Sequence, residues 1–338
     1  FKQKTAYEIM PSLVGSEMCI RDRSIDASSH FAEGESSVDQ RSTGDFITIK
    51  DGYFYDPAKS DYWLPHGIAY QTWNRALGQW QTTDDIEADL TRMEEIGVNS
   101  LRVDFVWKYI EEEGDNQFNW SNYDYLLEAA KRHNMRVFAL IGYQWPPDWF
   151  PGTPGKEGES GWYTMHPPDY DHKGVYHSQR WTSDIISFED PEAQRQYTEF
   201  LSAVATRYKD NPTIAAWILC NEYGYVGFWI YKHVGYDLDC ENAFRDWLEE
   251  TYGNNITALN AVWGTNYTDF EQVIMPEEYN RDNPAWFDLV QWREDSLAKF
   301  VAIGAKAVKD ADPNHLITYS AVGMYWGEED WRYHAEDP

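Results

Sequence analysis

The sequence predicts an α/β fold, a (β/α)8 barrel of the TIM type in which about the first five β/α units are present. Short apolar runs alternate with amphipathic helical patterns, which indicates a parallel sheet. The runs are apolar throughout rather than at every second residue, so we expect the strands to be buried on both faces. The turn after the first run, "QTWNRALGQW", lacks the G-x-G-x-x-G of doubly wound nucleotide-binding sheets, and the barrel is therefore the better prediction.

The chain divides into three parts. Residues 1–23 begin without Met, show no helical or strand period and resemble translated sequencing-adapter read-through, so we expect them to be non-biological. Their apolar runs are far shorter than the apolar core of about 7–15 residues that a signal peptide needs. Residues 24–45 are rich in Ser and acids and predict a disordered lead-in or linker. Residues 46–338 predict a barrel catalytic domain, which we expect to be an incomplete fragment.

The elements of the domain begin with a short hairpin, "ITIKDGYFYD", that turns at Asp51 and Gly52. "HGIAYQTW" predicts the first barrel strand. The helix that follows, in "TTDDIEADLTRMEEIG", has apolar residues at three- and four-residue spacing, with Thr83 as its cap and Gly97 at its end. The next predicted elements are a strand in "NSLRVDFVW", a helix in "SNYDYLLEAAKRHN" and a third strand in "MRVFALIGY".

A long segment, residues 143–189, then interrupts the alternation. It is rich in Trp, Pro, Gly and His, and a loop of that length in a compact domain is usually functional. The alternation resumes with a helix in "DPEAQRQYTEFLSAVATRYKDN" and a fourth strand in "TIAAWILC". Helical segments near 241–252, 256–262 and 285–310 lead to "HLITYSAVG", the fifth predicted strand.

Composition limits the class of partner. The formal net charge of −29 argues against a nucleic acid, whose phosphates such a surface would repel. No apolar run approaches the length of a membrane span. The 17 Trp, 24 Tyr and 15 Phe residues include many in polar stretches such as "GYQWPPDWFPG". Aromatic faces in polar loops suit sugars, although core packing explains most individual aromatic residues. An oligo- or polysaccharide is therefore the expected partner.

The predicted carboxyl ends of the strands carry polar or aromatic residues, and in a barrel these ends form the active site. They are Gln71 and Trp73, Arg102 and Asp104, Tyr143 and Trp145, Asn221 and Glu222, and Tyr325 and Trp326. A carboxyl group at the end of a buried strand has a raised pKa, because desolvation disfavours its anion, and can serve as a general acid. The alternative for Glu222 is a helix N-terminal carboxylate that interacts with the helix dipole.

From about residue 64 onward the chain resembles glycoside hydrolase family 42, a β-galactosidase family of the Asn-Glu barrel clan. The resemblance rests on "MEEIGVNSLRVDFVWKYIEEEG", "MRVFALIGYQWPPDWF", "IAAWILCNEYG" and "CENAFRDWLEETYGNNITALNAVWGTNYTDFEQV". It implies that Glu222 is the acid/base, that Asn221 contacts the sugar next to the cleaved bond, and that Arg102 is an active-site arginine. In "HSQRWTS" it implies that Arg180 lies near the substrate. To these we add three expected substrate-binding residues, Asp104, Tyr143 and Trp145; Asp104 can hold Arg102 or a sugar hydroxyl.

Two stretches depart from the family pattern. Members often carry a C-x-C-x-x-C cluster that binds a structural zinc, but here Gly235 and Asp237 stand in place of two cysteines and only Cys240 remains. One thiolate does not make a tetrahedral site, so we predict no zinc, and the chemistry calls for no other metal or cofactor. Where the family has small residues and Thr in the third strand, this chain has "GYQWPPDW", which leaves the preference for galactose open.

The second carboxylate is expected outside the chain. A retaining glycosidase needs a nucleophile about 5–5.5 Å from the acid/base, and the resemblance implies a Glu at the end of the seventh strand. At about 31 residues per unit that strand ends near residue 380, so the nucleophile is missing and we expect the fragment to be inactive. Glu328 and Glu329 follow the fifth strand, where adjacent acids are more often partners of a helix dipole.

The predicted function is a retaining glycoside hydrolase that cleaves terminal β-galactosides or related β-glycosides. One alternative is an endo-acting hydrolase of the same clan, agarase- or mannanase-like, and another is a non-catalytic carbohydrate-binding pseudoenzyme. Residues 143–189 decide between the first two, because a closed pocket favours exo action and an open Trp-lined cleft favours endo action. A homo-oligomer is compatible with the full-length chain, and the sequence indicates no compartment.

Overall fold

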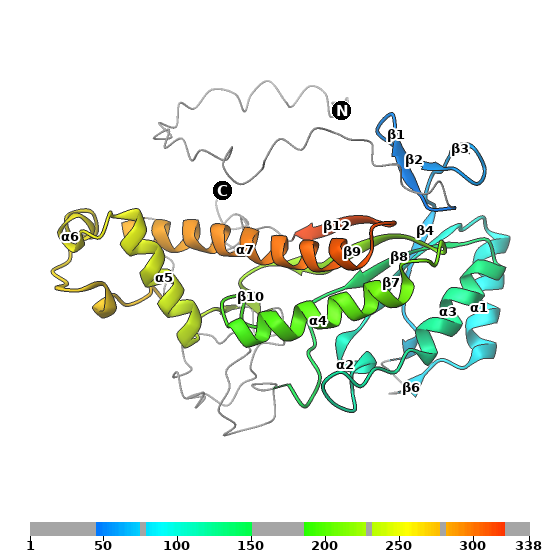
Figure 1. The fold of residues 1–338 in the computed structure, drawn as a ribbon, viewed down its shortest axis with the longest axis horizontal. Coiled ribbons are helices and arrows are strands. Elements are labelled where there is room, and N and C mark those ends of the chain that lie inside the picture. Colours follow the sequence, from blue (N-terminus) through cyan, green and yellow to red (C-terminus); the bar gives the residue numbers. More distant parts are fainter. Residues whose placement is uncertain (1–44, 75–78, 151–185, 228–231, 278–281, 322–338) are drawn as a thin grey trace, which may run out of the picture. The chain divides into compact units, whose positions relative to one another are not determined.

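The computed structural model describes residues 45–74, 79–150, 186–227, 232–277 and 282–321. Its centre is a parallel sheet of five strands in the order β12-β9-β8-β7-β4 (Figure 1). The strands are β4 (Gly67–Tyr70), β7 (Ser100–Phe105), β8 (Arg136–Ile141), β9 (Ile214–Tyr223) and β12 (Leu316–Ala321). Each barrel strand pairs with the next one along the chain, which is the strand order of a (β/α)8 barrel. The predicted fold class is confirmed for its first five units.

Helices follow the strands along the chain. They are α1 (Thr83–Glu95), α2 (Trp107–Ile110), α3 (Ser121–Arg132), α4 (Pro191–Tyr208), α5 (Leu238–Thr251), α6 (Ile256–Trp263) and α7 (Pro284–Ala311), with a short 3-10 turn, η4 (Phe270–Gln272), before α7. Of these helices, α5 and α6 lie beyond the end of the sheet (Figure 1). Asn283 caps α7 and Pro284 opens it, a combination that favours a helix start. Thr82 rather than the expected Thr83 caps α1, because its side chain accepts from the amide of Asp85 in a capping box.

The two faces of the sheet differ in polarity, as β7 shows. Leu101, Val103 and Phe105 are at most 1% exposed and belong to the core between sheet and helices. Arg102 and Asp104 alternate with them and are half-buried on the opposite face. Since side chains alternate along a strand, the helix side is the apolar core and the other side carries the polar groups. That polar face corresponds to the interior of the barrel.

Smaller strand pairs lie at the two ends of the sheet. β1 (Thr48–Lys50), β2 (Tyr53–Asp56) and β3 (Asp61–Tyr62) form an antiparallel sheet, which confirms the predicted hairpin and its turn. Arg136, at the start of β8, holds it by a 3.2 Å ion pair with Asp56. At the other end, β5 (Trp73–Asn74) pairs with β6 (Gln79–Trp80), and β10 (Val226–Gly227) pairs with β11 (Lys232–His233). None of the helices described here combines the length and apolarity that crossing a bilayer would take.

Candidate active site

Three of the predicted site residues meet at the carboxyl ends of the strands. Nη2 of Arg102 donates a 2.6 Å hydrogen bond to Oδ1 of Asn221, which joins β7 to β9. Nη1 of Arg102 lies 3.4 Å from Oδ1 of Asp104, and Nε2 of Gln71 donates to Oδ2 of Asp104 at 3.0 Å. These contacts form a connected chain of polar groups, so each side chain is held by its neighbour. Asp104 lies beside Arg102, as expected.

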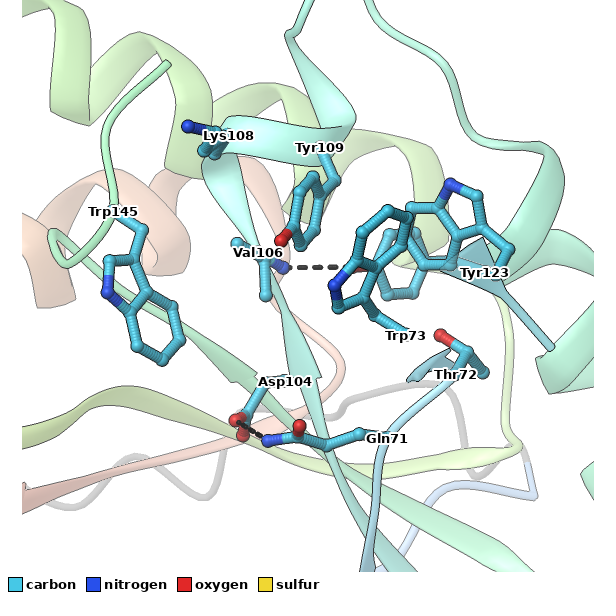
Figure 2. Close-up of a pocket in the computed structure, with 10 residues that line it drawn as sticks. Gln71, Thr72, Trp73, Asp104, Val106, Lys108, Tyr109, Tyr123 and Trp145 are labelled. Carbon is cyan, nitrogen blue, oxygen red and sulfur yellow. Dashed lines mark hydrogen bonds between the residues drawn. The ribbon is translucent and has the colours of Figure 1, made fainter. Parts of the chain in front are cut away.

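Two cavities open at this edge of the sheet. The first, of about 230 Å³, holds the Arg102–Asn221 pair; the second, of about 330 Å³, lies beside it and is largely aromatic (Figure 2). They share four lining residues, Gln71, Asp104, Val106 and Trp145. The other residues that line the second cavity are Thr72, Trp73, Trp80, Lys108, Tyr109 and Tyr123. The second volume lies at the lower end of the range for ligand pockets, about 300–1,000 Å³, and the first is smaller than that range.

Asn221 reaches the polar face because the backbone of β9 is irregular. Strict alternation would place Asn221 on the same face as Trp217 and Leu219, which are at most 1% exposed. Cys220 instead has a left-handed backbone with φ of 61°, and the register of β9 with β12 shifts at the same place. The α-carbon of Cys220 approaches Gly142 so closely that a Cβ there would lie 2.8 Å away, and Gly142 therefore admits no side chain.

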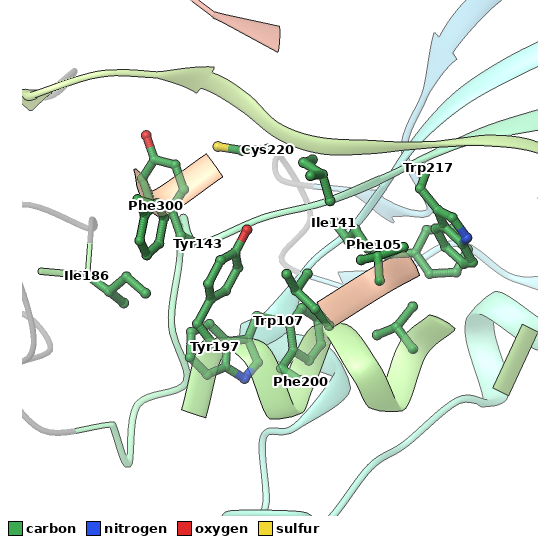
Figure 3. Close-up of a cluster of buried hydrophobic side chains, with 14 of the residues drawn as sticks. Phe105, Trp107, Ile141, Tyr143, Ile186, Tyr197, Phe200, Trp217, Cys220 and Phe300 are labelled. Carbon is green, nitrogen blue, oxygen red and sulfur yellow. The ribbon is translucent and has the colours of Figure 1, made fainter. Parts of the chain in front are cut away.

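Two aromatic residues, Tyr143 and Trp145, were predicted at the end of β8, and the structure places only Trp145 at the cavities. Trp145 has a left-handed backbone with φ of 54° and lines both cavities. Tyr143 is fully buried, with its ring edge-on to Phe188 at 5.1 Å and to Phe300 at 5.8 Å (Figure 3). Burial raises the pKa of the Tyr143 phenol well above its ordinary value. Its position favours a packing role, since Tyr143 lies in the core and does not line either cavity.

Several predicted residues fall outside what the structure describes. Glu222 belongs to β9, next to Asn221, but the described structure extends only to its backbone. Arg180, Tyr325, Trp326, Glu328 and Glu329 all lie outside the described residues. Sequence reasoning passed over Trp80 and Tyr109, and it placed Gln71 and Trp73 at a strand end without giving either residue a role. The signal for the two tryptophans was their place in the polar turn "QTWNRALGQW".

Comparisons with known proteins identify the family of this chain. The sequence profile of glycoside hydrolase family 42, described as β-galactosidase, matches residues 76–336. This chain belongs to glycoside hydrolase family 42. The β-galactosidase BgaH of Haloferax lucentense is 26% identical over 272 residues, which are 77% of this chain and 37% of that protein. An Arthrobacter β-galactosidase is 31% identical over 214 residues, 59% of this chain and 27% of that protein.

Solved structures show the same fold. The β-galactosidase of the haloarchaeon Halorubrum lacusprofundi superimposes with a TM-score of 0.63 at 21% identity, covering 81% of this chain and 39% of that one. The catalytic domain of a Paenibacillus polymyxa β-amylase gives a TM-score of 0.56 at 20% identity, covering 75% of this chain and 64% of that one. The fold alone therefore does not select a substrate. This family 42 chain spans about a third of the length of the relatives named here.

The place of the family's zinc cluster is occupied by a hydrogen-bonded carboxyl group. Asp237 is 1% exposed and caps α5, and its Oδ1 accepts from the amide of Cys240 at 3.1 Å and from the hydroxyl of Ser187 at 2.9 Å. The described residues hold no group of three side chains suited to a metal ion. These residues do not fit zinc, because Gly235 supplies no ligand and a single buried thiol remains. The absence of zinc stays a prediction.

Asp237→Asn should stabilise the protein at high pH more than at low pH. Burial raises the pKa of Asp237 from 3.8 to about 7, so the folded state keeps a proton that the unfolded state releases. Stability is therefore lost as the pH rises from about 4 to about 7. Asn keeps the cap oxygen but does not ionise, so the stability gained by the substitution should be greater at pH 8 than at pH 5 by about 3 kcal/mol. Urea unfolding at both pH values measures this difference.

The matched control for this substitution is Asp246→Asn, on an exposed position of the same helix. It removes the same formal charge from the same element without touching a buried group. We expect its effect to be within about 0.5 kcal/mol of zero at both pH values. An Asp237→Asn gain that does not change between pH 5 and pH 8 would show that Asp237 is ionised in the folded protein at both pH values.

Proposed function

We propose that this protein is a retaining glycoside hydrolase that cleaves β-galactosides or related β-glycosides. The observation that carries the proposal is the Arg102–Asn221 hydrogen bond in a strand-end cavity, with Glu222 next along β9. Membership of family 42 and the β-galactosidase names of the relatives support the same substrate class. As the chain covers only part of those relatives, the activity is proposed for the full-length protein.

In this proposal the polar chain at the strand ends binds the sugar next to the cleaved bond. Arg102 and Asn221 supply a cation and an amide that can hydrogen-bond hydroxyl groups of one ring. Asp104 pairs with the guanidinium and is itself held by the amide of Gln71, which fixes these groups before the substrate arrives. Such preorganisation lowers the barrier because little reorientation is left for the transition state. Arg180 is proposed as a further substrate contact.

Glu222 acts as the general acid and then as the general base. As an acid it gives its proton to the glycosidic oxygen while a second carboxylate attacks the anomeric carbon, so the leaving sugar departs neutral. As a base it then takes a proton from the water that releases the glycosyl-enzyme. The second carboxylate is proposed to be a Glu on the seventh strand, which residues 1–338 do not include. Residues 1–338 alone are therefore proposed to be inactive.

The test is hydrolysis of p-nitrophenyl β-galactoside by the full-length protein, followed by proton NMR. Double displacement should give β-galactose as the first product, before mutarotation, because two inversions restore the configuration. First appearance of α-galactose would contradict the retaining mechanism. Sugar binding without hydrolysis of any β-glycoside would instead favour the pseudoenzyme.

A further inference from the structure

The second cavity, of about 330 Å³, has no role in the chemistry proposed so far. Its distinctive feature is a set of aromatic rings on two opposite sides, with polar groups below them (Figure 2). On one side Trp73 stacks on Tyr109 with ring centroids 4.8 Å apart, and Trp80 meets both rings edge-on at 5.3 Å. Trp145 lies on the other side. Each ring of the first set is supported by the other two, so this wall is preorganised.

The wall formed by Trp145 is also held in place. The carbonyl of Trp145 accepts from the amide of Lys108 at 3.0 Å, which attaches the segment after β8 to α2. Nζ of Lys108 binds Oδ1 of Asp148 at 2.5 Å, and the indole of Trp149 donates to the carbonyl of Glu111 at 2.5 Å. Three contacts therefore attach residues 145–149 to α2 and to its C-cap residue, Glu111. The spacing between the two aromatic walls is set by these contacts rather than by a ligand.

The chemistry of this cavity suits a pyranose ring. The C–H bonds of a sugar face carry partial positive charge, which aromatic faces attract through their quadrupole. Gln71 and Asp104 supply an amide and a carboxylate at the base of the cavity, where ring hydroxyls can reach them. An apolar pocket with a few fixed polar groups is the usual form of a small-molecule site. Because Gln71 and Asp104 also line the first cavity, one chain of linked sugars can occupy both.

The position of the cavity decides which side of the scissile bond it serves. The acid/base must lie beside the leaving group, since it protonates the departing oxygen, and Glu222 stands on β9. The first cavity includes Asn221 of β9, whereas the second is lined by residues that follow β4, by β7, α2 and α3, and by the segments around β5, β6 and Trp145. The second cavity therefore lies on the side away from Glu222. A ring bound there belongs to the part of the substrate that becomes the glycosyl-enzyme.

We propose that the second cavity is a subsite for a second sugar on the non-reducing side of the cleaved bond. This proposal rests on the proposed glycosidase function. The enzyme then acts on oligosaccharides and releases a disaccharide or cuts internally, in preference to removing single terminal sugars. Trp73 and Trp145 determine this specificity by stacking on the second ring.

The subsite is tested in the full-length protein with substrates that share p-nitrophenol as the leaving group and carry either one or two sugar rings. They are p-nitrophenyl β-galactoside and the p-nitrophenyl β-galactobiosides with β-1,3, β-1,4 and β-1,6 links, which differ only in the second glycone ring. At least one bioside should have a kcat/KM about tenfold above the monoside and release intact galactobiose. Trp73→Ala should lower kcat/KM on that bioside about tenfold, which corresponds to about 1.4 kcal/mol, and leave the monoside unchanged.

The controls distinguish a failure of the proposed subsite from a failure of the proposed glycosidase function. Trp120→Ala removes a partly buried tryptophan that packs against Phe118 and Tyr208, away from both cavities, and should not alter the ratio of the two rates. Should Trp73→Ala fail to fold, Trp73→Leu keeps bulk without an aromatic face, and its activity on the monoside reports folding. Equal rates on monoside and biosides, or equal losses on both in the variant, would overturn the subsite. Wild-type protein inert on all four substrates would instead refute the glycosidase.

Discussion

Glu222→Gln should lower kcat/KM on a galactosyl disaccharide by about 10³-fold, because the amide cannot give a proton to the departing sugar oxygen and general acid–base catalysis contributes about 10²–10⁴-fold. A dinitrophenyl galactoside needs no such proton, since its leaving group is a stable anion. Its first step should therefore persist in the variant, while the second step slows for lack of a base. We expect a burst of dinitrophenol followed by slow turnover, and added azide, a nucleophile that needs no base, should restore the rate. Stopped-flow absorbance in the full-length protein measures both phases.

The matched control is Glu113→Gln, an exposed carboxylate in the loop after α2. Its kcat/KM should stay within twofold of the wild type on both substrates. Unchanged activity of Glu222→Gln on the disaccharide would remove Glu222 from the mechanism. Equal losses on both substrates, with no burst and no response to azide, would indicate a structural role instead.

The sequence predicted the order of the β/α units because burial on both faces gives the strands an unbroken apolar composition. The prediction of strand ends was less accurate where residues pair in a short local ribbon instead of continuing a barrel strand. The first strand was expected to run to Trp73, but β4 ends at Tyr70. Trp73 instead pairs with Trp80 across the short β5–β6 ribbon. In an edge strand with exposed residues the apolar pattern does not stop sharply where the strand ends, so the end of β4 could not be predicted.

Side-chain direction explains which site residues were predictable. Tyr143 continues the odd-numbered series of Val137, Ala139 and Ile141, all fully buried toward the helices, so a period of two could have placed it in the core. Asn221 belongs to a buried series by the same rule, yet it reaches Arg102. The left-handed backbone at Cys220 redirects it, and an apolar run with an ordinary cysteine gives no sign of such an irregularity. Asn221 was predicted from its place beside Glu222 at the end of a strand and from the resemblance to a family, whereas its contact with Arg102 could not be predicted.

Gly235, which stands where the family has a cysteine, lies against the ring of Tyr225. A Cβ on Gly235 would lie 2.5 Å from Cδ1 and 2.6 Å from Cε1 of that ring. The ring is 4% exposed and lies 5.1 Å from Phe188 and 5.5 Å from Trp292, and its hydroxyl is hydrogen-bonded to Ser296. With contacts on several sides the ring has no space to move into. The tyrosine thus occupies the space that a side chain at position 235 would need, and the two positions are coupled.

Gly235→Ala should therefore destabilise the protein by about 2–5 kcal/mol: about 1–2 for a side chain on a left-handed backbone and about 1–3 for overpacking. Gly264→Ala is the matched control, since Gly264 has a φ of 71° against 88° for Gly235 and no atom within 4 Å of its added Cβ. Urea unfolding followed by tryptophan fluorescence gives both free energies, and the excess at Gly235 measures the contact with the ring. An equal loss in the free energy of unfolding for the two variants would mean that the ring of Tyr225 moves aside for the added methyl group. A large excess would mean that Gly235→Cys, which restores one cysteine of the family motif, disrupts the fold before it can bind a metal.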